Sequence, residues 1–269
     1  MGRSLMLLRN IALTLGLATF AATLVAEPIA VRQTQGATRG FLLMRSEDGK
    51  IIARGELNQV GHGEHITTRL VYRFTDGSLD DDTVSYNQRA TFQLVRDHHI
   101  QRGPYFPKPI DYLVDVPTGN VTSRSVDKDG KEKIEVEHMD LPADVYNGMV
   151  GTILLNVSPG APEFKLGMVA PTGKGRLIKL AISPEGEGTF SDIGMRHKAS
   201  IFRVKVELGG VAGVVAPVIG KQPADTMVWV LQGDVPGLVR EIGPLYDGGP
   251  IVSIELSGTS FARSPAQKP

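Results

Sequence analysis

Apolar and polar side chains alternate residue by residue along much of this chain, and this period of two restricts the fold more than any other feature. The stretch 83–94 is the longest example, with Val84, Tyr86 and Phe92 on one face and mainly polar side chains on the other. Successive side chains of a β-strand point to opposite faces, so the pattern predicts strands with one buried and one wetted face. Antiparallel sheets accommodate such strands, and we expect a mainly β protein.

Shorter alternating or apolar stretches continue along the chain. They fall at 69–74, 110–116, 133–138, 164–169, 177–182, 201–208, 226–232, 238–242 and 251–256. Several are separated by residues that favour tight hairpins, namely Asp48-Gly49, Thr118-Gly119-Asn120 and Asp129-Gly130. The expected architecture is a single domain over 27–256, with about a dozen strands in a curved antiparallel sheet or open β-barrel.

One segment departs from the period of two. Within 141–155, Val145, Met149 and Ile153 recur at helical spacing, and Asp140 can cap the start of a helix. We therefore predict one short helix over about 141–155, set among the strands.

The two ends of the chain differ from the middle. The first 26 residues place two arginines before an uncharged apolar run that ends in small residues, which is typical of a secretory signal peptide. Cleavage is expected after Ala26, with cleavage after Ala22 or an uncleaved anchor as alternatives. The polar, proline-containing residues 257–269 are predicted to be disordered.

Composition narrows the compartment and the partners. No later apolar segment approaches the roughly 20 residues of a membrane helix, so no transmembrane segment is expected after signal removal. The chain has no cysteine, which argues against a disulfide-stapled scaffold. Its 29 basic residues balance 29 acidic ones, so nucleic acid is not an expected partner. We expect a periplasmic or secreted protein.

Two polar clusters resemble metal sites, but their spacing favours turns. His62-Gly63-Glu64-His65 lacks the helical His-Glu-x-x-His order of zinc proteases. The carboxylates at Asp76, Asp80, Asp81 and Asp82 are expected in a loop between strands, without the order of a calcium loop. The sequence therefore predicts no metal site.

No catalytic motif stands out. His98 and His99 point to opposite faces of an extended strand, so they do not form one site by themselves. We predict no catalytic residue and no cofactor. A hydrolase without a sequence signature, for example one using His98 with Asp97, is the less favoured alternative.

The segment 209–220 carries no charged or polar side chain, yet it contains four glycines and a proline. Its apolar surface must be covered. We interpret it as a buried crossover loop, with a flexible lid over a cavity or a membrane-touching element as the alternative.

The C-terminal part of the chain carries a resemblance. The runs 202–207, 229–234, 239–246 and 251–256, with a Trp-containing strand, an acidic turn and a closing hairpin, resemble bacterial periplasmic β-proteins of unknown function over 141–256. A helix among antiparallel strands is also similar to the lipoprotein-carrier class, half-barrels that wrap a helix and shield acyl chains. The Arg-lined cavity signature of the carriers is not found. This resemblance implies a lipid or acyl-chain ligand.

These features favour a non-enzymatic periplasmic protein that binds a hydrophobic ligand, a lipid or a lipoprotein, in a concave sheet. The candidate ligand contacts are aromatic or apolar residues outside the clearest strands or beside glycine: Trp229, Tyr105, Phe106, Val214, Val215 and Tyr246. The alternative is a structural or interaction module that pairs with another cell-envelope protein through an exposed strand edge.

Overall fold

The computed structural model describes residues 28–126, 129–170, 175–192, 194–207, 222–231, 233, 236–257 and 259–261. Within these ranges the elements are β1 (Thr38–Ser46), β2 (Ile51–His62), β3 (His65–Phe74), β4 (Leu79–Gln88), β5 (Phe92–Arg102), β6 (Ile110–Asp115), β7 (Asn120–Val126), β8 (Glu132–His138), α1 (Val150–Leu154), β9 (Phe164–Ala170), β10 (Arg176–Asp192), β11 (Met195–Glu207), β12 (Thr226–Leu231), β13 (Gly237–Pro244), β14 (Ile251–Leu256) and β15 (Thr259–Phe261). The expectation of a mainly β chain is confirmed.

All of these strands belong to one antiparallel sheet. Its order is β15-β10-β11-β12-β13-β14-β1-β2-β3-β4-β5-β6-β7-β8, with β9 beside β10. Strands β1 to β8 follow one another in sequence, and Gly49 and Gly130 take a positive φ at two of the predicted turns. Because β14 pairs with β1, strands from opposite ends of the chain lie side by side.

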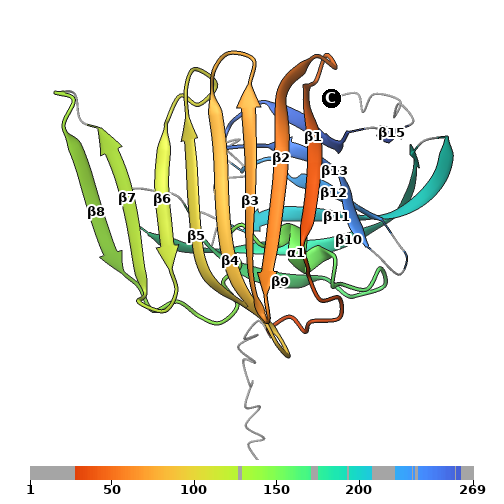
Figure 1. Cartoon of the computed structure of the whole chain (residues 1–269), viewed down its shortest axis with the longest axis horizontal. Helices are drawn as coiled ribbons and strands as arrows, with labels where there is room; N and C mark the ends of the chain where they lie inside the picture. Colours follow the sequence, from red (N-terminus) through yellow and green to blue (C-terminus); the bar gives the residue numbers. More distant parts are fainter. Residues whose placement is uncertain are drawn as a thin grey trace, which may run out of the picture.

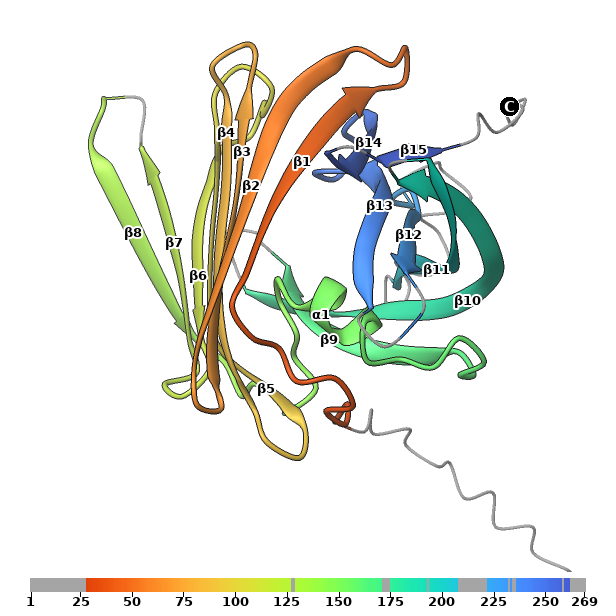
Figure 2. The ribbon, with the colours of Figure 1, turned by 45° about the vertical axis from the view of Figure 1, so that its right-hand side comes forward.

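The sheet curls without closing. In Figure 2 the wall formed by β10 to β13 faces the wall formed by β2 to β6, and α1 lies between them. Figure 1 shows β7 and β8 at the far side of the sheet from β15. These two ends of the described sheet do not pair, so the architecture is the open β-barrel that the sequence predicts.

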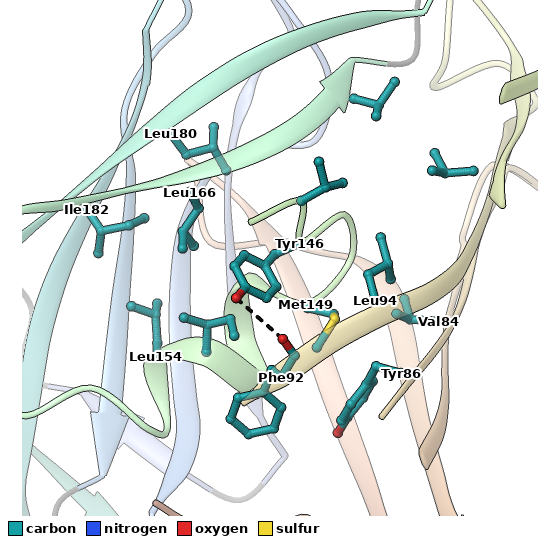
Figure 3. Packing of buried hydrophobic residues seen from close by; sticks show 14 of the residues in the cluster. Val84, Tyr86, Phe92, Leu94, Tyr146, Met149, Leu154, Leu166, Leu180 and Ile182 are labelled. Atoms are coloured by element: carbon teal, nitrogen blue, oxygen red, sulfur yellow. Dashed lines mark hydrogen bonds between the residues drawn. The ribbon is translucent and has the colours of Figure 1, made fainter. Parts of the chain in front are cut away.

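The main hydrophobic core fills the space around α1. Met149 lies beside Val84 and Leu94 of the opposite wall, and the hydroxyl of Tyr146 points toward the carbonyl of Phe92 (Figure 3). Residues from both walls join this core, and its largest fully buried members are Tyr86, Tyr146, Phe92, Phe202, Ile66, Met149, Ile153, Leu154, Leu166, Ile182 and Val114. The inner face of one wall is therefore buried against the helix and the inner face of the other.

Two smaller cores lie elsewhere. A second core on the inner face gathers Met44, Ala53, Tyr72, Phe74, Phe106, Val252 and Ile254. A third lies on the outer face, where the hairpin of β10 and β11 bends at an irregularity between Pro184 and Gly186 and packs near Trp229. Strand β12 is thus covered on both faces, as its almost continuous apolar sequence predicts.

The prediction of one strand over 83–94 is wrong. β4 ends at Gln88, and β5 begins at Phe92 after the exposed residues Arg89 and Ala90. Alternation does not reveal this turn because the apolar side chains before and after it lie on the same face of the sheet. On that face the ring centroids of Tyr86 and Phe92 are 6.0 Å apart.

The predicted helix is also too long, since α1 covers only Val150–Leu154. The backbone before it pairs with β9 instead: the N–H of Gly167 donates to the carbonyl of Asp144 at 2.8 Å, and the N–H of Tyr146 donates to the carbonyl of Gly167 at 2.9 Å. These bonds use peptide groups that a longer helix would need. Gly148, with φ of +63°, interrupts helical geometry just before α1.

Part of the predicted disordered tail forms a strand. Thr259–Phe261 is β15, which pairs with the end of β10, so the tail prediction is wrong for these residues. The predicted signal peptide, the segment 209–220 and residues 262–269 lie outside the described residues. Among the described helices there is none with the length and apolarity to cross a bilayer.

Candidate functional site

Ionisable side chains line the inner face of β4 and β5 between the two inner cores. Asp80 and Asp82 point inward in the same phase as the buried Val84, while Asp81 between them points outward to Arg69. The prediction of a loop is therefore wrong for Asp80, Asp81 and Asp82, and it is confirmed for Asp76, which lies in the turn between β3 and β4. Asp80 and Asp82 occupy the apolar phase of a strand, which is the one signal in the sequence that distinguishes them from turn residues.

A β-bulge in β5 turns Asp97 and the residues after it to the same face. At the bulge β4 advances by one residue while β5 advances by two, from Leu94 to Arg96. An inserted residue inverts the alternation, so even positions such as Leu94 point inward before it and odd positions such as Asp97 do so after it. Strict alternation could not reveal this change of face.

Asp80 is held by two neighbours. Its Oδ1 lies 2.7 Å from Nε2 of His99, and its Oδ2 accepts a hydrogen bond from Nε2 of Gln101 at 3.0 Å. The same amide nitrogen donates to the carbonyl of Leu245 at 3.1 Å, which ties the site to the segment after β13. Burial lowers the pKa of His99, but the hydrogen bond to Asp80 and the neighbouring carboxylates outweigh it and raise the pKa. The imidazolium form is favoured.

Asp82 and Asp97 form a second, less satisfied pair. The Oδ1 atom of each is shielded from solvent and has no hydrogen-bond partner. A Cβ placed on Gly148 would stand 3.0 Å from an oxygen of each carboxyl group. Burial raises the pKa of Asp97 to about 6, and burial together with the charge of Asp97 raises the pKa of Asp82 well above its usual range. The two carboxyl groups therefore share a proton at moderately acidic pH.

Glu241 of β13 approaches from the other wall. Its cross-strand neighbours Val228 and Ile254 are both buried on the inner face. Burial raises the pKa of Glu241 to about 7, the charge of Asp80 adds to the shift, and no basic side chain of the described chain offsets it. Burial, followed by the charges of Glu241 and Asp80, also raises the pKa of Tyr72, which is the cross-strand neighbour of Asp80.

The inner face is not fully packed beside these groups. Leu57, Leu70, Asp82 and His99 are successive cross-strand neighbours, here called the inner row, and each keeps part of its surface accessible. The side chain of His99 is 26% exposed. Inward-facing leucines in a close-packed interior would be buried. The accessible surface of the two leucines therefore adjoins that of Asp82 and His99 on the inner face of the sheet.

Three of the predicted ligand contacts come together at one end of the site. Tyr105 lies 5.3 Å from Phe106 and 6.1 Å from Tyr246, measured between ring centroids, and Phe106 lies 5.9 Å from Tyr246. Burial raises the pKa of Tyr105 to about 12, and its hydroxyl is shielded without a hydrogen-bond partner. This aromatic group adjoins the Asp80 site because Tyr246 directly follows Leu245.

Of the remaining predicted contacts, Trp229 does not join them. Trp229 lies in the third core on the outer face, where the guanidinium of Arg240 stands 5.3 Å from its ring. Val214 and Val215 lie outside the described residues. The structure thus unites the aromatic residues of the β5–β6 and β13–β14 connections and separates them from the tryptophan.

The other polar motifs take the places that their spacing predicts. His62 and His65 face each other across the β2–β3 turn, and Nδ1 of His65 lies 3.0 Å from Oδ1 of Asn87. His98 points away from the interior, with Nε2 2.9 Å from Oδ1 of Asp111. The described residues contain no group of three potential ligands arranged to hold a metal ion.

Comparison with known proteins finds a structural similarity without a family assignment. No family model and no curated protein matches the chain. Among solved structures, the chain is similar to a β-barrel-like protein of a domain of unknown function, DUF1849, from Brucella abortus. The identity is 8% and the TM-score is 0.48, with 85% of this chain and 99% of that chain covered.

Proposed function

We propose that this protein binds an amphipathic ligand, an apolar chain with a positively charged head group, against the inner row of its curved sheet. The observation that carries the proposal is Glu241, a half-buried carboxyl group that lies between the buried Val228 and Ile254 and that no described basic residue neutralises. Enclosed charges are normally paired, so a cation brought by the ligand would supply the missing partner. This proposal keeps the expected lipid or acyl chain and adds a positive charge on its head group.

The sign of the head group follows from the charges around the site. Asp80 and His99 offset each other, and the pair of Asp82 and Asp97 retains negative charge when it holds one proton. Glu241 adds a further negative charge as it ionises. An anionic head group would be repelled here, whereas an ammonium group would be attracted.

The apolar part of the ligand is inferred from the leucines. Leu57 and Leu70 lead along the inner face to the acidic residues, and Leu42 on β1 also keeps accessible surface. Covering such surface stabilises a complex by about 25 cal/mol for each Å² removed from water. A chain lying across these strands would bring its head group to the carboxylates.

Binding is proposed in preference to catalysis, and the periplasm as the compartment. The unpartnered oxygens of Asp82 and Asp97 have almost no accessible surface, so a substrate does not reach them. The carboxyl pair therefore acts as an internal proton site. The proposed compartment rests on the charged, apolar and small-residue pattern of residues 1–26.

A pair of probes with matched chains and opposite charge tests the head group. Calorimetric titration at neutral pH is expected to show decylammonium binding at least about tenfold more tightly than decanoate. Glu241→Gln should remove most of this preference. Glu56→Gln makes the same charge change on the outer face of β2, where Glu56 pairs with Arg39, and should leave the preference intact. Equal affinities for the two probes, or no binding of either, would contradict the proposal.

The affinity for decylammonium should also depend on pH. Because the pKa of Glu241 is raised to about 7, this group is mostly protonated in mild acid and mostly ionised in mild base. We expect the affinity to rise between about pH 5 and pH 8 and then to level off. Titrations across this range should show a smaller rise for Glu241→Gln, and an unchanged rise in that variant would show that another group controls binding.

A further inference from the structure

β8 presents a long strand edge that the described structure leaves without a neighbouring strand. At the other end of the sheet, β15 has only three residues. The free edge of β9 is covered by the segment before α1, since Gly167 donates to the carbonyl of Asp144 and Val169 donates to Oδ1 of Asn147, both at 2.8 Å. β8 has seven residues and pairs with β7 alone.

β8 lacks three of the features that commonly protect strand edges, namely proline, a bulge and short length, and of the usual protective features it carries only charged side chains. β8 contains no proline, pairs with β7 without a break in register, and is exposed at every residue. Ile134 and Val136 on this strand are 54% and 62% exposed, and the neighbouring Val126 is 69% exposed. The strand therefore presents a regular backbone edge beside uncovered apolar side chains.

Charges on the other face of this strand follow an ordered pattern. Lys131 directly precedes β8, and Lys133, Glu135 and Glu137 follow at alternate positions, so all four project to one face. Read along the chain, the signs are two positive and then two negative. Such a row is complementary to itself when it is reversed, because each lysine then lies opposite a glutamate.

We propose that two copies of this chain pair antiparallel through β8, about a twofold axis at Ile134. In this register Lys133 lies opposite the partner's Glu135, and Lys131 lies opposite the partner's Glu137. Ile134 meets the partner's Ile134 on the apolar face. Opposite charges and apolar pairs directly across strands stabilise sheet pairing, and the paired edges satisfy each other's peptide groups.

The order of the charges favours a second copy of this chain as the partner of β8, and it favours the antiparallel direction. A parallel copy in register would place lysine against lysine and glutamate against glutamate, which destabilises pairing. Within one strand Lys133 already contacts Glu135 at 2.6 Å, and both side chains remain substantially exposed, so the partner's groups can join this pair. Both views show β8 at the outer side of the sheet, where a second copy can approach (Figures 1 and 2).

Exchange of charges tests the pairing with the full chain. Sedimentation velocity over a range of concentrations should show a reversible dimer that weakens at high salt. Lys133→Glu alone and Glu135→Lys alone each create two like-charge contacts and should weaken dimerisation by about tenfold or more. An equimolar mixture of the two variants restores opposite charges and should recover the heterodimer.

These variants keep the test separate from folding, because both side chains lie on an exposed strand, and circular dichroism should be unchanged. A wild-type chain that stays monomeric at every concentration would overturn the proposal. This holds also if β8 is then found to pair with a strand of another protein. Dimers that persist equally in both single variants, or a mixture that does not dimerise, would also overturn it.

Cross-linking tests the register. The chain has no cysteine, so a single introduced thiol gives no background. Ile134→Cys lies on the proposed axis and should form a disulfide-linked dimer in a glutathione redox buffer. Val136→Cys lies opposite the partner's Glu132 and should cross-link much less. Equal cross-linking at the two positions would exclude this register.

Discussion

Gly148→Ala is expected to lower the free energy of unfolding by about 3 kcal/mol, the sum of backbone strain and overpacking. Gly148 has a φ of +63°, a conformation that disfavours any side chain. A Cβ there would overlap Cγ2 of Val84 and would also stand 3.0 Å from oxygens of Asp82 and Asp97. Thermal and urea unfolding should show the loss, because the backbone between the carboxyl pair and α1 must move.

Gly63→Ala is the matched control for this prediction. Gly63 also has a φ of +63°, but a Cβ there would have no heavy atom within 4 Å. It should cost only the backbone strain, about 1 kcal/mol. If the two variants lose the same stability, the close approach to Val84 does not contribute.

Asp97→Asn is expected to raise the free energy of unfolding by about 3 kcal/mol near pH 8 and to leave it nearly unchanged near pH 4. Burial raises the pKa of Asp97 from 3.8 to about 6, so the folded state binds a proton that the unfolded state has released. Stability then falls as pH rises from about 4 through about 6. Asparagine removes this penalty and can donate to Asp82. Urea unfolding across this pH range measures the effect.

Asp81→Asn provides a control of opposite sign on the same strand. Asp81 points outward, and its hydrogen bonds to Arg69, at 2.9 and 2.5 Å, lower its pKa. A lowered pKa stabilises the fold above the pKa of the unfolded chain, so this variant should lose stability near pH 8. The loss should be below about 1 kcal/mol because Arg69 is largely exposed. A stabilised Asp81→Asn would contradict the assignment of faces.

Alternation predicts the fold well because it reports which face of a strand is wet. The period of two identifies β6, β8 and β14 almost to their ends, but it finds β3 only from Arg69 onward. It does not reveal the turn between Gln88 and Phe92, since both strands return to the same face. The helix fails for a different reason: Val145 and Met149 are buried as helical spacing predicts, but the backbone around them pairs with β9.

The candidate site was only partly predictable. Tyr105, Phe106 and Tyr246 do gather, because apolar connections at one end of a curled sheet must cover one another. The acidic residues escaped prediction because their arrangement depends on the bulge in β5 and on the approach of β13, far along the chain. The spacing of residues within a strand predicts neither the bulge nor the approach of β13. Glu241 in particular reads as an ordinary charged position of an amphipathic strand.

The pairing of β1 with β14 determines when the sheet can finish forming during folding. Leu42 lies opposite Leu256, so the second edge of β1 is satisfied only when β14, near the end of the chain, has been made. Contacts between such distant positions give a high contact order, and the loop closure they demand slows folding. A chain that emerges from its N-terminus first would carry β1 to β8 as a local meander with the β1 edge open. Chaperone protection of that edge would matter most during synthesis, before the C-terminal strands arrive.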